Sequence, residues 1–102
     1  MKRLFVVMLN RGAAYETARP LEAQQDWEAH RSFMNDLEME RFIFLGGPLE
    51  GTNDVLLIFH ATDPEEIRNR LAMDPWHARD LLRIARIAPW DLRLGSLSPA
   101  ST

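Results

Sequence analysis

FIFLGGPLEGTNDVLLIF, residues 42–59, is the centre from which the architecture of this chain can be worked out. Two apolar segments, 42–45 and 55–59, flank a stretch that contains Gly, Pro and Asn. Short apolar runs bounded by turn residues are typical of strands. Because the two runs are close in sequence, we predict an antiparallel hairpin with a loop longer than a two-residue turn. Gly46-Gly47-Pro48 is expected to end the first strand, at a turn where backbone passes closely.

The segment before this hairpin contains a strand and a helix. Leu4–Leu9 is apolar and β-branched enough for a buried central strand, and a loop is expected from Asn10 to Pro20. From Leu21 to about Arg41 the pattern is helical. Its apolar stripe recurs at spacings of 4, 3, 4 and 3 through Ala23, Trp27, His30, Met34 and Leu37.

The segment after the hairpin contains a second helix and a last strand. Asp63-Pro64 is a strong helix start, since Asp caps and Pro suits the first helical position, and this helix is expected to run to about Met73. Asp74-Pro75 repeats the signal and predicts a short helical turn to about Arg79. Leu81–Leu94 is predicted to be a long strand, interrupted at Pro89.

The predicted order β-α-β-β-α-β is that of the α+β, ferredoxin-like fold. Such a fold has a four-stranded antiparallel sheet with both helices on one face, and here the other face is expected to be apolar. A contiguous apolar face usually marks an interface, so we predict a homodimer in which two sheets pack together as a barrel-like pair. Residues 1–95 are expected to form this domain, followed by a short polar tail, 96–102.

Composition excludes several classes of function. With 102 residues, of which 46% are hydrophobic and 26% charged, the chain is expected to be one ordinary soluble domain. Its net charge is −3 and basic residues are interspersed with acidic ones, so no nucleic-acid partner is expected. The apolar run 4–9 is too short for a signal peptide or membrane span, and cysteine is absent. We therefore expect a cytoplasmic protein with no membrane partner.

His30 lies on the apolar stripe of the first helix, so it is predicted to face the sheet. One interpretation is a core histidine satisfied by a backbone carbonyl or a carboxylate, since His is often partly buried. The other is a general acid or base, because imidazole exchanges a proton near neutral pH. In that role it benefits from a carboxylate that holds its tautomer.

Asp74 is the candidate for that carboxylate. Asp before Pro is also a favoured helix cap, so Asp74 could be a cap alone, like Asp63 eleven residues earlier. The residues that follow the two Asp-Pro pairs differ: Glu65 suits solvent, whereas Trp76 must be buried. Asp74 is therefore expected beside an apolar pocket wall.

Metal, phosphate and acyl-transfer chemistry lack a motif in this sequence. His30, His60 and His77 form no HxH or HxxxH pair, so no metal site is predicted. No Lys-Ser/Thr follows Gly46-Gly47-Pro48 as it would in a phosphate loop, and there is no Gly-x-Ser-x-Gly elbow. No cofactor is expected.

The chain resembles the YCII (YciI-like) family over nearly its whole length. The resemblance rests on the order and spacing of an apolar first strand, His30 before Phe33 and Leu37, Phe44-Leu45-Gly46-Gly47-Pro48, Gly51, the strand Val55–Phe59, Asp63-Pro64-Glu65-Glu66, Asp74-Pro75-Trp76 and Pro89-Trp90. It implies a dimeric α/β barrel, like that of muconolactone isomerases and small cofactor-free monooxygenases. It also implies an acid–base pair at the pocket, which carries over to His30 and Asp74. One relative dechlorinates a chlorinated, hydroxylated aromatic, so a lyase, dehalogenase or isomerase-like reaction is implied.

Three functions remain open on these residues. The first is a cofactor-independent enzyme in which His30 transfers a proton of a small aromatic or carbonyl-bearing substrate while Asp74 orients the imidazole. The second is a non-catalytic small-ligand-binding or accessory domain. The third, a dimerisation module, would need no inward-facing histidine. The residues expected to line the pocket and its mouth are Trp27, Met34, Trp76, Arg11 and Arg19.

Overall fold

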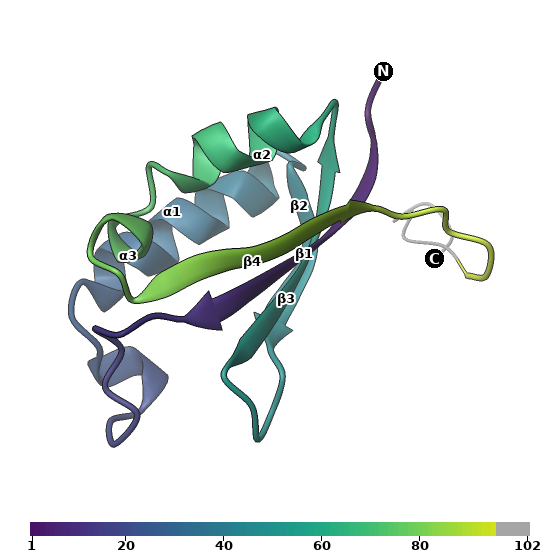
Figure 1. The fold of residues 1–102 in the computed structure, drawn as a ribbon. Helices are drawn as coiled ribbons and strands as arrows, with labels where there is room; N and C mark the ends of the chain where they lie inside the picture. Colours follow the sequence, from purple (N-terminus) through teal and green to yellow (C-terminus); the bar gives the residue numbers. More distant parts are fainter. Residues whose placement is uncertain (96–102) are drawn as a thin grey trace.

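The computed structural model describes residues 1–95, and the predicted tail 96–102 lies outside these described residues. The elements, in chain order, are β1 (Arg3–Arg11), a 3₁₀ turn (Leu21–Ala23), α1 (Trp27–Met39), β2 (Ile43–Pro48), β3 (Asp54–Ala61), α2 (Pro64–Leu71), α3 (Pro75–Ala78) and β4 (Leu82–Pro89). The four strands form one antiparallel sheet in the order β2-β3-β1-β4, with the helices together on one side (Figure 1). The predicted ferredoxin-like α+β fold is confirmed.

The face of the sheet toward the helices carries the hydrophobic core. Side chains alternate between the faces of a strand, and in β1 the residues Phe5, Val7 and Leu9 are buried. They pack in one cluster with buried residues of the helices, including Leu37 of α1 and Ile67 of α2. Burial of this face fixes the register of β1, because a slip by one residue would turn every core side chain outward.

The opposite face of the sheet is apolar at its centre. Val6 pairs with Ile58 and Met8 pairs with Leu56 across β1 and β3. Leu45 of β2 also opposes Ile58, and 54% of its surface is exposed. Within residues 1–95, no helix covers this face (Figure 1).

The first α-helix begins at Trp27, not at Leu21 as predicted. After the 3₁₀ turn, Gln24 has extended backbone, with ψ at 154°. Its buried side chain donates to backbone carbonyls of the preceding loop and accepts one of that loop's N–H groups. Asp26 then turns the chain with a left-handed φ of 59° before α1 starts. The apolar stripe did not reveal this break, because the contacts of one glutamine side chain produce it.

The glycines of the central hairpin belong to a strand. Gly46, Gly47 and Pro48 continue β2 and pair with β3, so the predicted turn at this position is wrong. Pro48 is tolerated because β2 is an edge strand, where a missing donor leaves no gap in the ladder. The turn comes later, where the Leu49 N–H donates to the carbonyl of Asp54.

Other boundaries shift by a few residues. β1 extends to Arg11, past the predicted end at Leu9, and α2 ends at Leu71. Pro89 ends β4 and does not interrupt it, since it has no N–H to continue the ladder. Both predicted caps are present, because Asp63 and Asp74 each accept a main-chain N–H at the start of a helix. None of the helices in residues 1–95 has the length and apolar character needed to cross a bilayer.

Candidate functional site

His30 and Asp74 are in hydrogen-bond contact, although 44 residues separate them. His30 lies near the start of α1, and Asp74 immediately precedes α3. Nδ1 of His30 is 3.0 Å from Oδ1 and 2.9 Å from Oδ2 of the carboxylate. Only 8% of His30 and 2% of Asp74 is exposed. The pair is therefore buried in the protein interior. A charge-assisted hydrogen bond is stronger there than at the surface.

Asp74 is a helix cap and a histidine partner at the same time. Its Oδ1 accepts the main-chain N–H of Trp76 at 3.0 Å, which satisfies one open donor at the start of α3. Both carboxylate oxygens also face His30. The two interpretations of Asp74 that the sequence left open are therefore compatible, because a carboxylate has enough lone pairs for both bonds.

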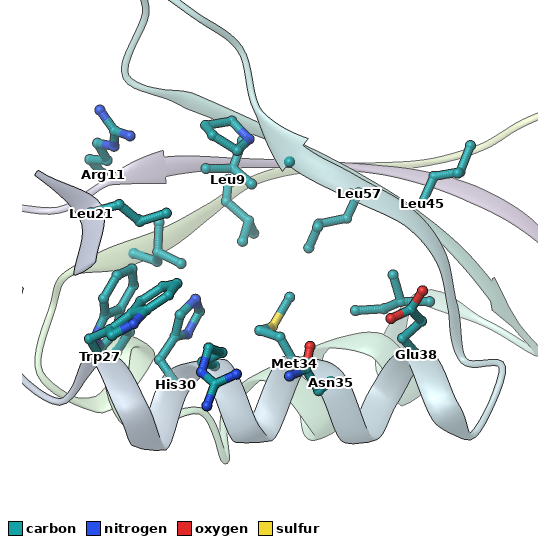
Figure 2. Close-up of a pocket in the computed structure, with 18 of the residues that line it drawn as sticks. Leu9, Arg11, Leu21, Trp27, His30, Met34, Asn35, Glu38, Leu45 and Leu57 are labelled. Atoms are coloured by element: carbon teal, nitrogen blue, oxygen red, sulfur yellow. The ribbon is translucent and has the colours of Figure 1, made fainter.

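The hydrogen-bond pattern assigns the tautomer of His30. Because Asp74 accepts at Nδ1, the Nδ1 atom of the neutral ring carries the proton and Nε2 has a free lone pair. Figure 2 shows the His30 ring projecting from α1 toward the space between the helix and the sheet. Nε2 is thus the ring atom that can accept a proton from a bound molecule and release it again.

Aromatic rings surround this imidazole. The indole of Trp76 lies parallel to it, with ring centroids 3.8 Å apart and planes 2° from parallel. Trp27 is tilted by 45° at 6.1 Å from His30, and Tyr15 meets Trp76 edge-on. The indole N–H of Trp76 donates to the Gln25 carbonyl at 2.6 Å. The rings form an apolar wall and leave no unsatisfied indole donor at Trp76.

A pocket of about 270 Å³ lies between α1 and the sheet, and His30 is one of its lining residues. A dry cavity of about 150 Å³ can hold benzene, so this pocket has room for a substituted single ring. In Figure 2 it extends from Arg11, Leu21 and Trp27 at one end to Glu38 and Leu45 at the other. The lining residues that belong to the strands are mostly apolar and include Leu9, Ile43, Val55, Leu57 and Leu82.

The structure brings most of the candidate residues to this pocket. Trp27, Met34, Trp76 and Arg11 line it together with His30. Asp74 contacts the imidazole but is not itself a lining residue of this pocket.

Arg19 does not line the pocket. Its exposed side chain pairs with Glu16 at 3.5 Å, within the loop that precedes the 3₁₀ turn. The sequence placed Arg19 one residue before Pro20 and the start of a long helix. Because α1 begins only at Trp27, Arg19 instead lies on the outer surface of this loop.

Gly46 is a lining residue that the sequence did not single out. A Cβ built on Gly46 would collide with Cδ2 of Leu57, which lines the same wall, whereas a Cβ on Gly47 would meet nothing within 4 Å. A glycine inside a strand often marks the close approach of another group. That signal could have identified Gly46 had the Gly-Gly pair been assigned to a strand. Tyr15, also missed, carried no comparable signal.

Few charges reach the pocket. The guanidinium of Arg11 lies over the Tyr15 ring, 4.3 Å from its centroid, and no ion pair within residues 1–95 involves Arg11. Arg31 also lines the pocket but pairs with Glu28 at 3.0 Å. Arg11 is therefore the lining cation that is free to receive an anionic group. Across the described part of the chain, no cluster of three or more His, Cys, Asp or Glu side chains could hold a metal ion.

One ion pair lies at the turn that carries the chain from α3 into β4. Arg83 donates to both oxygens of Asp80, at 2.6 and 2.7 Å. The hydrogen bond from Arg83 lowers the pKa of the Asp80 carboxyl below its ordinary value. Asp80 has a left-handed φ of 61°, and a Cβ on Gly12 would collide with the Asp80 carbonyl. This turn therefore packs closely against the loop that follows β1.

Comparison with known proteins identifies a solved structure with a similar fold. No family model matches the chain, and no curated protein matches it. Among solved structures it is similar to 5-chloro-2-hydroxyhydroquinone dehydrochlorinase (TftG) from Burkholderia phenoliruptrix AC1100, in complex with 2,5-dihydroxybenzoquinone. Identity is 21%, the alignment covers 90% of this chain and 95% of that chain, and the TM-score is 0.58. At this identity the similarity concerns the fold alone.

Proposed function

We propose that this protein is an acid–base enzyme of the YCII type, in which His30 transfers a proton of a small bound molecule. The observation that carries the proposal is the arrangement of the imidazole. Its Nδ1 is held by a buried carboxylate, and its ring reaches into a pocket of about 270 Å³. A histidine that only filled the core would need the hydrogen bond but no cavity beside its other nitrogen.

In the proposed reaction, Nε2 takes a proton from an O–H or C–H group of the bound molecule, and it later gives this proton to solvent or back to the molecule. The resulting imidazolium is stabilised by the Asp74 carboxylate, which also keeps the ring in its productive tautomer. The electron pair left on the molecule then either expels a leaving group, such as halide, or takes a proton back at another atom. The first outcome is an elimination and the second an isomerisation. In both reactions, His30 and Asp74 are the groups that transfer and stabilise the proton.

The nature of the substrate is inferred from the pocket and from the structural neighbour. The pocket is mostly apolar, of the right volume for one substituted ring, and Arg11 at one end offers a positive charge. The neighbour is named as a dehydrochlorinase of a chlorinated hydroxyhydroquinone. These observations support a small hydroxylated aromatic, or a carbonyl compound of similar size, with an anionic group that would lie toward Arg11.

We also propose that the protein is a homodimer that pairs through the open face of the sheet. The central pairs Val6–Ile58 and Met8–Leu56 are apolar on this face, and no helix of the described residues lies over them. A second copy would bury this face against the same face of its partner, in a self-complementary two-fold contact. A small domain buries a low fraction of its surface on folding, so the additional area buried in a dimer adds substantially to its stability.

The proposed function is tested by a ligand screen followed by a turnover assay. Hydroxylated and halogenated aromatics and short keto acids are tested for a thermal shift, and each stabilising compound is then incubated with the protein. Products are followed by NMR and halide release with an ion-selective electrode. The substitution His30→Gln is expected to reduce the turnover rate by about 10²–10⁴-fold, the usual contribution of a general base. His77→Gln is the matched control, because His77 is exposed and does not line the pocket.

The outcomes separate the two candidate functions. Turnover that depends on His30 supports the enzyme. A thermal shift without any product, reduced in His30→Gln, would instead assign a non-catalytic ligand-binding domain. Turnover that His30→Gln leaves at the wild-type rate would overturn the role of His30.

A further inference from the structure

We propose that Trp76 is the positioning residue of this site: its indole sets the plane of the His30 ring and so determines where Nε2 points. This inference rests on the proposed function, since it concerns the group that the proposal makes catalytic. It assigns Trp76 a role beyond that of a pocket wall, which is what the sequence predicted for it.

The Asp74 carboxylate does not by itself determine the direction of Nε2. It keeps Nδ1 within hydrogen-bond distance of both oxygens, at 2.9 and 3.0 Å, without a preference for one of them. The energy of a hydrogen bond depends mainly on its length and on the angle at the hydrogen. The ring turns by rotation about the Cβ–Cγ bond, and a small turn of this kind brings Nδ1 closer to one oxygen as it leaves the other, at little cost in hydrogen-bond energy. Such a turn tilts the ring plane and moves Nε2 within the pocket.

The indole of Trp76 removes this freedom. The two ring planes are only 2° from parallel and their centroids are 3.8 Å apart, which is van der Waals contact over the whole face. Rotation of the imidazole about its Cβ–Cγ bond would drive one edge of the ring into the indole. The carboxylate and the indole thus restrain different motions of His30, and together they leave one orientation.

Trp76 is itself held firmly enough to act as a reference plane. It is 1% exposed, and its indole N–H donates to the carbonyl of Gln25 at 2.6 Å. Its main-chain N–H donates to Asp74, so one residue contacts both members of the pair, the carboxylate through its backbone and the imidazole through its ring. Tyr15 packs edge-on against the indole from another side.

Trp27 provides a contrast within the same pocket. It lines the cavity as Trp76 does, but its ring is tilted by 45° from His30 at 6.1 Å, so it does not stack on the imidazole. It is also only partly buried. Trp27 can contact a ligand without controlling the imidazole, which makes it the matched control.

The test compares Trp76→Leu with Trp27→Leu by NMR of the histidine ring. In the wild type, the ring C–H protons of His30 are expected upfield of those of the exposed His77, because they lie over the indole face. The order parameter of the His30 ring C–H bonds should fall in Trp76→Leu and stay at the wild-type value in Trp27→Leu. With a substrate from the screen, Trp76→Leu should lower kcat several-fold with KM little changed, whereas Trp27→Leu should act mainly on KM.

Trp76→Leu could destabilise the core, so a second variant keeps the test decisive. Trp76→Phe retains a ring face under His30 and should show an intermediate order parameter. The proposal is overturned if the wild-type His30 protons show no upfield shift, or if the ring is as ordered in a folded Trp76 variant as in the wild type. Equal loosening in Trp27→Leu would also overturn it. The NMR measurements need no ligand, so they stand even if no compound is turned over and the proposed function fails.

Discussion

The imidazole of His30 and the carboxylate of Asp74 join the beginning of α1 to the beginning of α3 by a buried hydrogen bond with Nδ1···O distances of 2.9 and 3.0 Å. The two helix starts are far apart in the sequence, since His30 and Asp74 are 44 positions apart. The same carboxylate orients the imidazole and caps the start of α3 through the main-chain N–H of Trp76. One carboxylate is therefore both a helix cap and the partner of a histidine.

Replacing Asp74→Asn should uncouple these roles. The Asn oxygen can still cap α3, but its amide N–H₂ then faces Nδ1 of His30 and favours the tautomer with the proton on Nε2. We expect a loss of stability of about 1–3 kcal/mol, measured by urea denaturation, and a fall in turnover of about 10²–10⁴-fold. Asp63→Asn is the matched control: it also precedes Pro at a helix start, but no histidine contacts it. Equal effects of both substitutions would show that Asp74 acts as a cap only.

Adding a methyl group at Gly46 should reduce the pocket. A Cβ there collides with Leu57, a lining residue that must shift, and overpacking of this kind costs about 1–3 kcal/mol. Gly46→Ala is expected to weaken binding of the larger ring compounds more than that of the smallest ones, measured by calorimetry. Gly47→Ala should affect binding less, because Gly47 also lines the pocket but nothing lies within 4 Å of the new Cβ and no lining side chain has to move. Unaltered binding in Gly46→Ala would mean that ligands do not reach this wall.

Removing the charge of Arg11 should weaken the binding of anionic ligands. Arg11→Gln is expected to lower their affinity by about tenfold or more, since a hydrogen bond to a charged group contributes about 1.5–3 kcal/mol. Neutral analogues of the same size should bind with nearly wild-type affinity. Arg19→Gln is the control, because Arg19 pairs with Glu16 outside the pocket. If both substitutions weaken binding equally, the effect is one of net charge and not of a contact in the pocket.

The Asp80–Arg83 pair should make stability depend on pH in the acid range. Because Arg83 lowers the pKa of Asp80 in the folded protein, the stabilisation is fully present above the ordinary value of 3.8. It is lost as the pH falls through the lower folded-state pKa. Asp80→Asn, which tolerates the left-handed backbone, should therefore flatten the decline of the urea midpoint below about pH 4.

The size of this acid effect should be small, because the pair is exposed to solvent and screened by salt. Arg83→Gln removes the other partner and should flatten the same part of the curve. An acid decline as steep in both variants as in the wild type would contradict the assignment.

A charge on the open face of the sheet should dissociate the proposed dimer. Val6 lies opposite Ile58 at the centre of this face, and an unpaired carboxylate buried there costs about 3–5 kcal/mol. Val6→Glu is expected to raise the dimer dissociation constant at least about 100-fold, as measured by sedimentation velocity. Arg68→Glu, on the exposed side of α2, should leave it unchanged. A wild-type protein that sediments as a monomer at micromolar concentration would contradict the dimer.

Features set by local chemistry were predictable along the chain. The strands follow from runs of apolar, β-branched residues, and the starts of α2 and α3 follow from the pairs Asp63-Pro64 and Asp74-Pro75. The boundaries failed where a non-local contact intervened. The side chain of Gln24 breaks the first helix by bonding to the preceding loop, and pairing with β3 keeps Gly46 and Gly47 in a strand.

The amino-acid sequence alone determined the order of the elements and the identity of the two candidate residues, because hydrophobic period and helix capping act over a few neighbouring positions. Only the tertiary structure decided that Asp74 caps and contacts His30 together, that Trp76 stacks on the imidazole, and that a pocket lies beside them. These outcomes depend on how α1 and α3 pack against one sheet. Such packing is a property of long-range contacts, and a local pattern of residues does not encode the distance or the plane between two rings.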